Sequence, residues 1–456
     1  MRSEERPLDA AIRGLASGAR QLARVLDVTR PEAWTALDEG IRIAIGYGEI
    51  ERPAHPWLST SRLPGALRAM SRAPAPTEAR LALALCDPSG LIREAALPHA
   101  AEHLGALPLV AVRTTDWAVP VRDRARAVLA EALPRADAAT LAVTASVILR
   151  IRRRLRGDAA VGLLRDVVHA APAATVRALL LSPDRATRRF AFGLAVERGL
   201  LTPTELARTA AYDNDVAVQD TAATAALAAG VPDDTLPVLL AARSGRVRSA
   251  GVTALRKAGR AAEAEAFLHD RSGMVRACAR WVLRQDGRDP VALYRAACAD
   301  LETVPDRAPL GLAECGDRKG DTEVLWGLTG HPRATVRASA VAGLRVFEVV
   351  DHARLLRLLD DPAPGVVREA ARALLPWANR LPEEELLRRT GPDRPLHVRV
   401  RALRLLREHG TGAYEEAARR LVEDPDPVAR LRFRRALGIE ETGPGPRGVR
   451  AWFRFS

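Results

Sequence analysis

A short pattern that recurs about every 30 residues constrains the fold of this chain more than any other feature of its sequence. The pattern begins with a turn residue, usually Asp, followed by an apolar residue five positions later, Arg six later and Ala nine later. Successive copies of the Arg position lie 28 to 31 residues apart, except across two gaps of 66 and 61 residues. Each long gap has room for one degenerate copy, so the chain carries about twelve copies of one unit. The Arg positions are 93, 122, 188, 248, 276, 337, 368, 399 and 430, with Gln219 in the remaining slot.

Each copy of the unit predicts two helices joined by a turn. Runs such as ARLALALCD precede the turn and are rich in Ala and Leu, which favours helix over strand. Asp-Pro, Ser-Pro or Ser-Gly then ends the first helix, and Asp or Ser caps the second. Because so short a hairpin cannot bury both apolar faces alone, neighbouring hairpins must stack. The sequence therefore predicts an all-α fold, a right-handed α-solenoid of about twelve helical hairpins.

The D-x-x-x-x-V-R-x-x-A pattern resembles the short HEAT-like repeat, also called the phycobilisome-lyase type, over about residues 80–440. This resemblance indicates the fold specifically but gives almost no information about function. It implies that the turn Asp and the helix Arg bond to each other or across adjacent repeats, as a ladder. The ladder residues that it implies are Asp87/Arg93, Asp116/Arg122, Asp270/Arg276, Asp361/Arg368, Asp393/Arg399 and Asp424/Arg430. Gln219 and Ala242 depart from the pattern, and Pro98 and Pro376 are expected to kink or end a helix.

The extent of the repeat divides the chain into three regions. Residues 1–80 lie outside the register and predict an N-terminal helical cap, with helices over 5–27 and 31–46, and a Pro-rich linker. Residues 81–440 form the HEAT-like solenoid. Residues 441–456 contain ETGPGPRG and RAWFRFS, which predict a flexible basic-aromatic tail.

Composition bounds the partners of the protein. The formal net charge is +13, and 67 of the 69 basic residues are arginine, which fits either a GC-rich genome or an anionic partner. The basic excess is concentrated in residues 151–200 and 401–456. The longest uncharged stretch is 12 residues, too short to cross a bilayer, so no membrane contact is expected. The charged N-terminus and four scattered cysteines without a CxxC pair predict a cytoplasmic protein.

The sequence contains few motifs that are typical of enzymes. It contains no HExxH, no Walker A loop and no GxSxG elbow. A GxGxxG match at Gly443, Gly445 and Gly448 lies in the Pro-containing tail, with no strand before it. We therefore predict no enzyme activity, no cofactor, no metal and no small-molecule substrate.

Two groups of arginines are candidates for binding a partner. The first lies at RIRRRLR (150–156) and at Arg189. The second occupies positions 10 and 14 after the turn residue, which lie about 40° apart near the side of the second helix opposite its core face. Such residues would form a stripe along a basic groove, or they are simply solvated arginines. The candidate residues are Arg150, Arg153, Arg154, Arg189, Arg256, Arg280, Trp281, Arg284, Arg345, Arg372, Arg407 and Arg434.

Three functions fit these features. The leading one is a non-enzymatic scaffold that holds a protein with an acidic surface in the basic groove. The second is a protein that binds the phosphate backbone of nucleic acid. The third follows from a resemblance to alkylpurine DNA glycosylases, which HEAT-like repeats also form and which use Asp, Trp and Arg; only Asp116-Trp117 supplies such a pair here.

Overall fold

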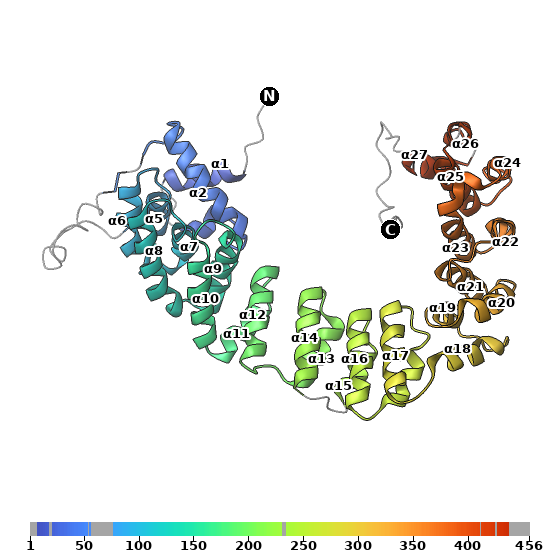
Figure 1. Cartoon of the computed structure of the whole chain (residues 1–456). Coiled ribbons are helices and arrows are strands. Elements are labelled where there is room, and N and C mark those ends of the chain that lie inside the picture. The colour runs from blue at the N-terminus through green and yellow to red at the C-terminus, as the bar shows by residue number, and fades with distance from the viewer. Residues whose placement is uncertain are drawn as a thin grey trace, which may run out of the picture. The chain divides into compact units, whose positions relative to one another are not determined.

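The computed structural model describes residues 7–17, 21–52, 54–55, 76–229, 234–410, 412–424 and 426–436 (Figure 1). Within these ranges the regular structure is all helical, with no strand, as predicted. The chain divides into two compact units, Met1–Val238 and Leu239–Ser456, here called unit 1 and unit 2. Most of the predicted Pro-rich linker and the whole predicted tail, residues 441–456, lie outside the described residues.

Unit 1 stacks five hairpins behind an N-terminal pair of helices. The helices α5, α7 and α9 contact one another in order, and α6, α8 and α10 do the same in a second layer (Figure 1). Two-layer stacking of this kind is what the repeat requires. The helices are α1 (Pro7–Ala16), α2 (Pro31–Gly46), α5 (Glu78–Leu85), α6 (Gly90–Ala100), α7 (Leu107–Arg113), α8 (Val119–Ala132), α9 (Ala138–Ile151), α10 (Asp158–Ala170), α11 (Ala173–Leu180), α12 (Arg185–Glu197), α13 (Pro203–Tyr212) and α14 (Val216–Ala228).

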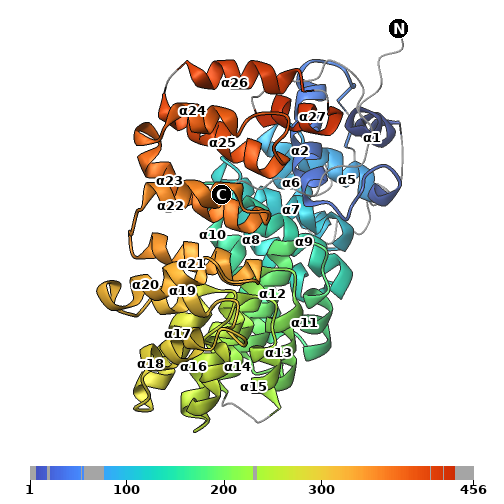
Figure 2. The ribbon, with the colours of Figure 1, turned by 90° about the vertical axis from the view of Figure 1, so that its right-hand side faces the viewer.

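Unit 2 continues the same arrangement. The second helices α19, α21, α23 and α25 contact one another in turn, and α20, α22 and α24 lie in the other layer (Figures 1 and 2). The boundary between the units falls inside α15. The elements are α15 (Thr235–Leu240), α16 (Gly245–Lys257), η4 (Ala261–Phe267), α17 (Gly273–Gln285), α18 (Pro290–Ala299), α19 (Ala308–Ala313), α20 (Arg318–Leu328), α21 (Ala334–Val346), α22 (His352–Arg357), η5 (Leu358–Asp360), α23 (Pro364–Leu374), η6 (Leu375–Arg380), α24 (Glu383–Arg388), α25 (Leu396–His409), α26 (Ala413–Val422) and α27 (Pro427–Ala436).

The N-terminal segment packs against the first repeats of unit 1. Pro31 begins α2, as predicted, and Trp34, Leu37 and Ile41 of this helix are buried. The first predicted helix is shorter than expected, because α1 ends at Ala16 and a 3-10 turn follows at Leu22–Arg24. The helix α2 contacts α7 and α9, so the apolar face of this segment covers the start of the stack.

The Ala of the repeat pattern lies where second helices pack most closely. It occupies the seventh position after the N-cap of each second helix. In one repeat this position is Gly251, where a Cβ atom would lie 3.1 Å from the Cβ of Leu239. Small residues at this position let neighbouring helices approach. The equivalent alanines are Ala96, Ala125, Ala191, Ala222, Ala279, Ala340, Ala370 and Ala402, all buried.

The regular spacing of the Arg in this chain produces a ladder of ion pairs, in which the Arg of one repeat binds the Asp of the next. Arg93 Nε and Nη2 donate to the carboxylate of Asp116 in the following repeat, at 3.0 and 2.9 Å. The same guanidinium reaches back through Nη1 to the backbone oxygen of Asp87 at 2.8 Å. Arg248 binds Asp270 in the same way, and Arg337 binds Asp361.

Of the two pairings that the resemblance implies, the carboxylates follow the one across adjacent repeats. Arg93, Arg248 and Arg337 each bind the main-chain oxygen of their own turn and the carboxylate of the next turn. The carboxylate of the turn Asp also accepts the N–H two residues on, as Asp270 does from Ser272 at 2.7 Å, which fixes the turn. Asp424 therefore pairs with Arg399 of the preceding repeat, while Arg430 reaches only the Asp424 main chain.

Three ladder positions depart from this rule. Arg122 binds the main-chain oxygen of Asp116 at 3.1 Å but no carboxylate of the following turn among the described residues. Arg276 donates to Glu314, at the C-terminal end of α19, because the degenerate repeat that follows lacks the turn Asp at this position. Arg368 is not a ladder residue at all. The ladder Arg stands four residues after the N-cap in each regular second helix, but α23 has its N-cap at Ala363 and carries Val367 there. Arg368 is thus turned about 100° away from the ladder.

Candidate interaction surface

The N-cap position of each second helix decides which predicted arginines are exposed. Arg280 stands eight residues after its N-cap, Ser272, one turn beyond the ladder position, and faces the next repeat. It is 8% exposed and donates to Glu314 at 2.6 Å. The expectation that Arg280 is on the open side was therefore wrong. Arg284, Arg345 and Arg407 stand twelve residues after their N-caps and are exposed.

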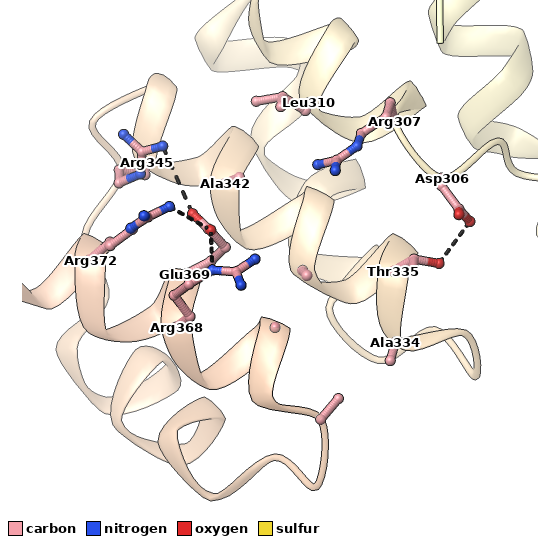
Figure 3. Close-up of a pocket in the computed structure, with 13 residues that line it drawn as sticks. Asp306, Arg307, Leu310, Ala334, Thr335, Ala342, Arg345, Arg368, Glu369 and Arg372 are labelled. Carbon is pink, nitrogen blue, oxygen red and sulfur yellow. Dashed lines mark hydrogen bonds and ion pairs between the residues drawn. The ribbon is translucent and has the colours of Figure 1, made fainter. Parts of the chain in front are cut away.

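Glu369 of α23 is the centre of an arginine cluster in unit 2 (Figure 3). Its side chain is buried, yet three guanidinium groups converge on its carboxylate. Arg372 Nη1 lies 3.0 Å from Glu369 Oε1, Arg368 Nε lies 3.2 Å from the same atom, and Arg345 Nη2 of α21 lies 3.9 Å from Oε2. The three arginines are each 43–47% exposed, so they cover the glutamate from the solvent side.

Two arginines of α25 extend this cluster. Arg401 and Arg404 line a narrow cleft with Arg368 and Arg372. Burial and the positive charges of Arg404, Arg368 and Arg372 lower the pKa of Arg401. Neither Arg401 nor Arg404 forms an ion pair with a carboxylate of the described residues. We call Glu369 with Arg345, Arg368, Arg372, Arg401 and Arg404 the Glu369 cluster.

A hollow of about 420 Å³ adjoins the Glu369 cluster on the side of α19 and α21. Its floor is formed by small and apolar residues, among them Leu310, Ala338 and Ala342. Arg307 stands across it, and Asp306 accepts a hydrogen bond from Thr335 at 2.7 Å at its far end (Figure 3). The surface therefore combines an apolar depression with an arginine rim.

Arg345 and Arg372 were predicted from the sequence, but Arg307, Arg368, Arg401, Arg404 and Glu369 were not. Arg368 was assigned to the ladder although it lies seven residues after Asp361, where the pattern has its Arg at six and Val367 stands. Keeping to the spacing of the pattern would have placed Arg368 on a different face of the helix. The charge pattern R-E-x-x-R at 368–372 was the remaining clue, because Arg372 lies three residues after Glu369 and four after Arg368, and residues so spaced share a helix face.

A second predicted group lies on α16 and α17. The indole of Trp281 is 43% exposed, as predicted, and the guanidinium carbon of Arg256 lies 5.6 Å from its ring centre. Arg284 is exposed one turn further along α17. Arg407 pairs with its neighbour Glu408 at 3.1 Å, and Arg434 is half-buried.

Two of the four arginines predicted in unit 1 are paired with carboxylates. Arg150 donates to Glu32 at 2.7 Å, and Arg189 makes two 2.8 Å hydrogen bonds to the carboxylate of Asp215. Arg153 and Arg154 are exposed in the turn after α9. The structure thus separates the first predicted group into two ion pairs and an exposed turn.

The Asp116-Trp117 pair, named for the glycosylase resemblance, is divided between the core and the surface. Asp116 of the Asp116-Trp117 pair is buried between Arg93 and Arg113, while the Trp117 ring is exposed. In the part of the chain that the structure describes, no group of three or more His, Cys, Asp or Glu residues could hold a metal ion. Burial raises the pKa of the Cys298 thiol to about 12, which keeps it protonated. No helix among the described residues has the length and apolar character needed to span a membrane.

No known family model and no curated protein matches this chain. Similar solved structures include yeast importin-beta (Kap95p), at 14% identity over 93% of this chain and 60% of that one, with a TM-score of 0.33. The karyopherin Kap121p bound to the SUMO protease Ulp1p gives 12% identity over 77% of this chain and 47% of its own, with a TM-score of 0.31. An engineered protein gives 18% identity over 79% of this chain and 97% of that one, with a TM-score of 0.22. At these TM-scores the likeness carries no argument about function, and the assignment of a HEAT-like helical-hairpin fold stands on the hairpins and the ladder.

Proposed function

We propose that this protein is a non-enzymatic scaffold of phycobilisome-lyase-type HEAT-like repeats in the cytoplasm, and that the Glu369 cluster holds an acidic segment of a protein partner. The observation that carries the proposal is the charge imbalance at Glu369. Three arginines from two successive second helices contact the Glu369 carboxylate, and two more from α25 line a narrow cleft with Arg368 and Arg372. Arginine presents a planar fork of donors that matches a carboxylate, so such a surface favours an anionic ligand.

The adjoining hollow favours a protein segment over a nucleic-acid backbone. Its floor of Leu310, Ala338 and Ala342 has no polar side-chain atom, and apolar area of this kind contributes to binding only when apolar side chains cover it. An acidic peptide offers both carboxylates for the arginine rim and aliphatic groups for the floor. A phosphodiester backbone offers the charge alone.

The test is fluorescence anisotropy with the full chain and two labelled probes, a 15-residue Asp/Glu-rich peptide that includes Leu and Val, and a mixed-sequence DNA duplex. We expect the peptide to bind and the double variant Arg368→Ala/Arg372→Ala to bind it at least about tenfold more weakly, since each lost charged hydrogen bond is worth roughly 1.5–3 kcal/mol. The matched control is Arg419→Ala/Arg420→Ala on α26, which removes the same charge from exposed positions of the other layer.

Binding of the duplex alone, with a log-log salt slope near −0.9 for each neutralised phosphate, would replace this proposal with the nucleic-acid function. Equal loss of peptide affinity in the two double variants would show that only net charge matters, and would remove the Glu369 cluster as the site.

A further inference from the structure

The Glu369 cluster has more positive charge and more donors than its own carboxylate can satisfy. Arg345 and Arg368 each direct part of the guanidinium to Glu369, and their remaining N–H groups have no acceptor within hydrogen-bond distance among the described residues. Arg401 and Arg404 add two further charges without a carboxylate of their own. Four arginines, Arg345, Arg368, Arg401 and Arg404, are thus set against the one carboxylate of Glu369 among the described residues.

The way these charges converge restricts the ligand. They come from α21, α23 and α25, three helices that contact one another in sequence. The guanidinium groups of Arg345, Arg368 and Arg372 meet at the Glu369 carboxylate (Figure 3). Arg401 and Arg404 line a narrow cleft with Arg368 and Arg372. A single ligand carboxylate brings one negative charge and two acceptor atoms, which is enough for one arginine fork. A phosphomonoester brings a charge of about −1.5 to −2 and three acceptor oxygens in one compact group.

We propose that the Glu369 cluster recognises a phosphorylated serine or threonine within the acidic partner segment. This inference rests on the proposed function and names the group that the arginines bind. The hollow beside Glu369, of about 420 Å³, has room for the phosphorylated side chain and for an aliphatic neighbour on the floor of Leu310 and Ala342. Arg345, Arg368 and Arg372 then contact the phosphate oxygens, with Arg401 and Arg404 behind them.

Glu369 has a defined part in this recognition. It orients Arg368 and Arg372 in the absence of the partner, and it competes with the incoming phosphate for the same donors. Because the glutamate is buried, its negative charge repels a phosphate that approaches the same arginines. Glu369→Gln keeps the size and one acceptor oxygen but removes the charge, so it is expected to tighten phosphate binding about threefold to tenfold.

The experiment compares two peptide libraries on the immobilised full chain, one with a fixed central phosphoserine and one with serine at that position, both with the same Asp/Glu-rich flanks. We expect enrichment of the phosphorylated library by about tenfold or more. Arg368→Lys keeps the charge but loses the fork, and is expected to lose most of that preference. A folded Arg419→Ala/Arg420→Ala variant is expected to keep the preference for the phosphorylated library.

Three outcomes separate this inference from the proposed function. Equal binding of both libraries that Arg368→Ala/Arg372→Ala abolishes would overturn the phosphate inference and leave the acidic-segment scaffold standing. Binding of neither library would overturn both. Full competition by millimolar inorganic phosphate and by free phosphoserine alike, with no contribution from the peptide flanks, would show a site for a small phosphate and also overturn the inference.

Discussion

Two regions of this molecule are rich in arginine but use it in opposite ways. In unit 1, Asp38 and Asp116 are buried among Arg42, Arg93 and Arg113, where Arg113 contacts both carboxylates and Arg93 makes a two-pronged pair with Asp116. In unit 2, Glu369 is the one carboxylate in a cluster with five arginines, three of which contact it. The first network is largely buried and nearly balanced in charge, and the second is half exposed and unbalanced.

The difference teaches that the number of arginines in a segment does not indicate a binding site. A guanidinium taken out of water must find carboxylates and main-chain oxygens, and Arg93 finds both. Its charge is then committed to holding two repeats together. A guanidinium on the exposed face can use its N–H donors to bind a partner. The ratio of arginines to nearby carboxylates indicates how many of these donors are available.

The largest effect that would test this comparison is expected at Arg93. Arg93→Ala is expected to cost about 3–5 kcal/mol of stability in unit 1, because it removes two hydrogen bonds to the buried Asp116 and the donor of the Asp87 and Pro88 main-chain oxygens, although Arg113 still pairs with Asp116. Hydrogen exchange in α6 and α8 reports this loss locally, with Arg372→Ala as the control. A loss below that of the control would mean that the ladder does not hold the repeats.

Arg276→Ala is expected to have a smaller effect, about 1–3 kcal/mol. Its partner Glu314 keeps a second hydrogen bond, from Arg280, so the carboxylate is not left alone. Thermal melting combined with exchange in α17 and α19 measures the change. The double variant with Arg280→Ala should lose more than the sum of the single changes, and simple additivity would contradict a shared carboxylate.

Acid should weaken unit 1 through Asp215. Hydrogen bonds from Arg189 and Arg185 and from the Ala217 N–H hold the pKa of Asp215 well below its ordinary value of 3.8. The stabilisation is therefore fully present above about pH 4 and is lost as the pH falls toward the folded-state pKa. Exchange protection of α12 and α14 measured between pH 5 and 2.5 should fall at the acid end, and Asp215→Asn should lessen that fall. An identical acid slope in the variant would refute this assignment.

The smallest change in stability is expected at the exposed arginines. Arg284→Ala and Arg368→Ala should each stay within about 0.5 kcal/mol of the unchanged protein, as surface substitutions usually do. Only Arg368→Ala should also weaken binding of the acidic peptide by the anisotropy assay. A destabilisation by either that equals the loss in Arg276→Ala would erase the distinction between ladder and surface.

The sequence predicted the repeat, its two helices and the exposure of Trp281, because these depend on spacings of three, four and about thirty residues. It did not predict the partner of Arg276, since Glu314 lies 38 residues away in a degenerate repeat. It also misplaced Arg368 and Arg280. The two errors have different sources. Arg368 lies one residue past the ladder position, which Val367 holds, so its side chain is rotated by about 100°. Arg280 lies one helical turn past the ladder position and therefore faces the next repeat.

Ladder arginines bind the carboxylate of the next repeat along the chain, so the stack has a direction. A hairpin that keeps its own turn Asp and its own Arg can be duplicated or excised as a block, and the flanking repeats still meet a matching partner. The hairpin of α18 and α19 breaks this interchangeability. It accepts Arg276 through Glu314, at the C-terminal end of α19, instead of through a turn Asp. Growth or loss of whole repeats during evolution is therefore easier on either side of this hairpin than across it.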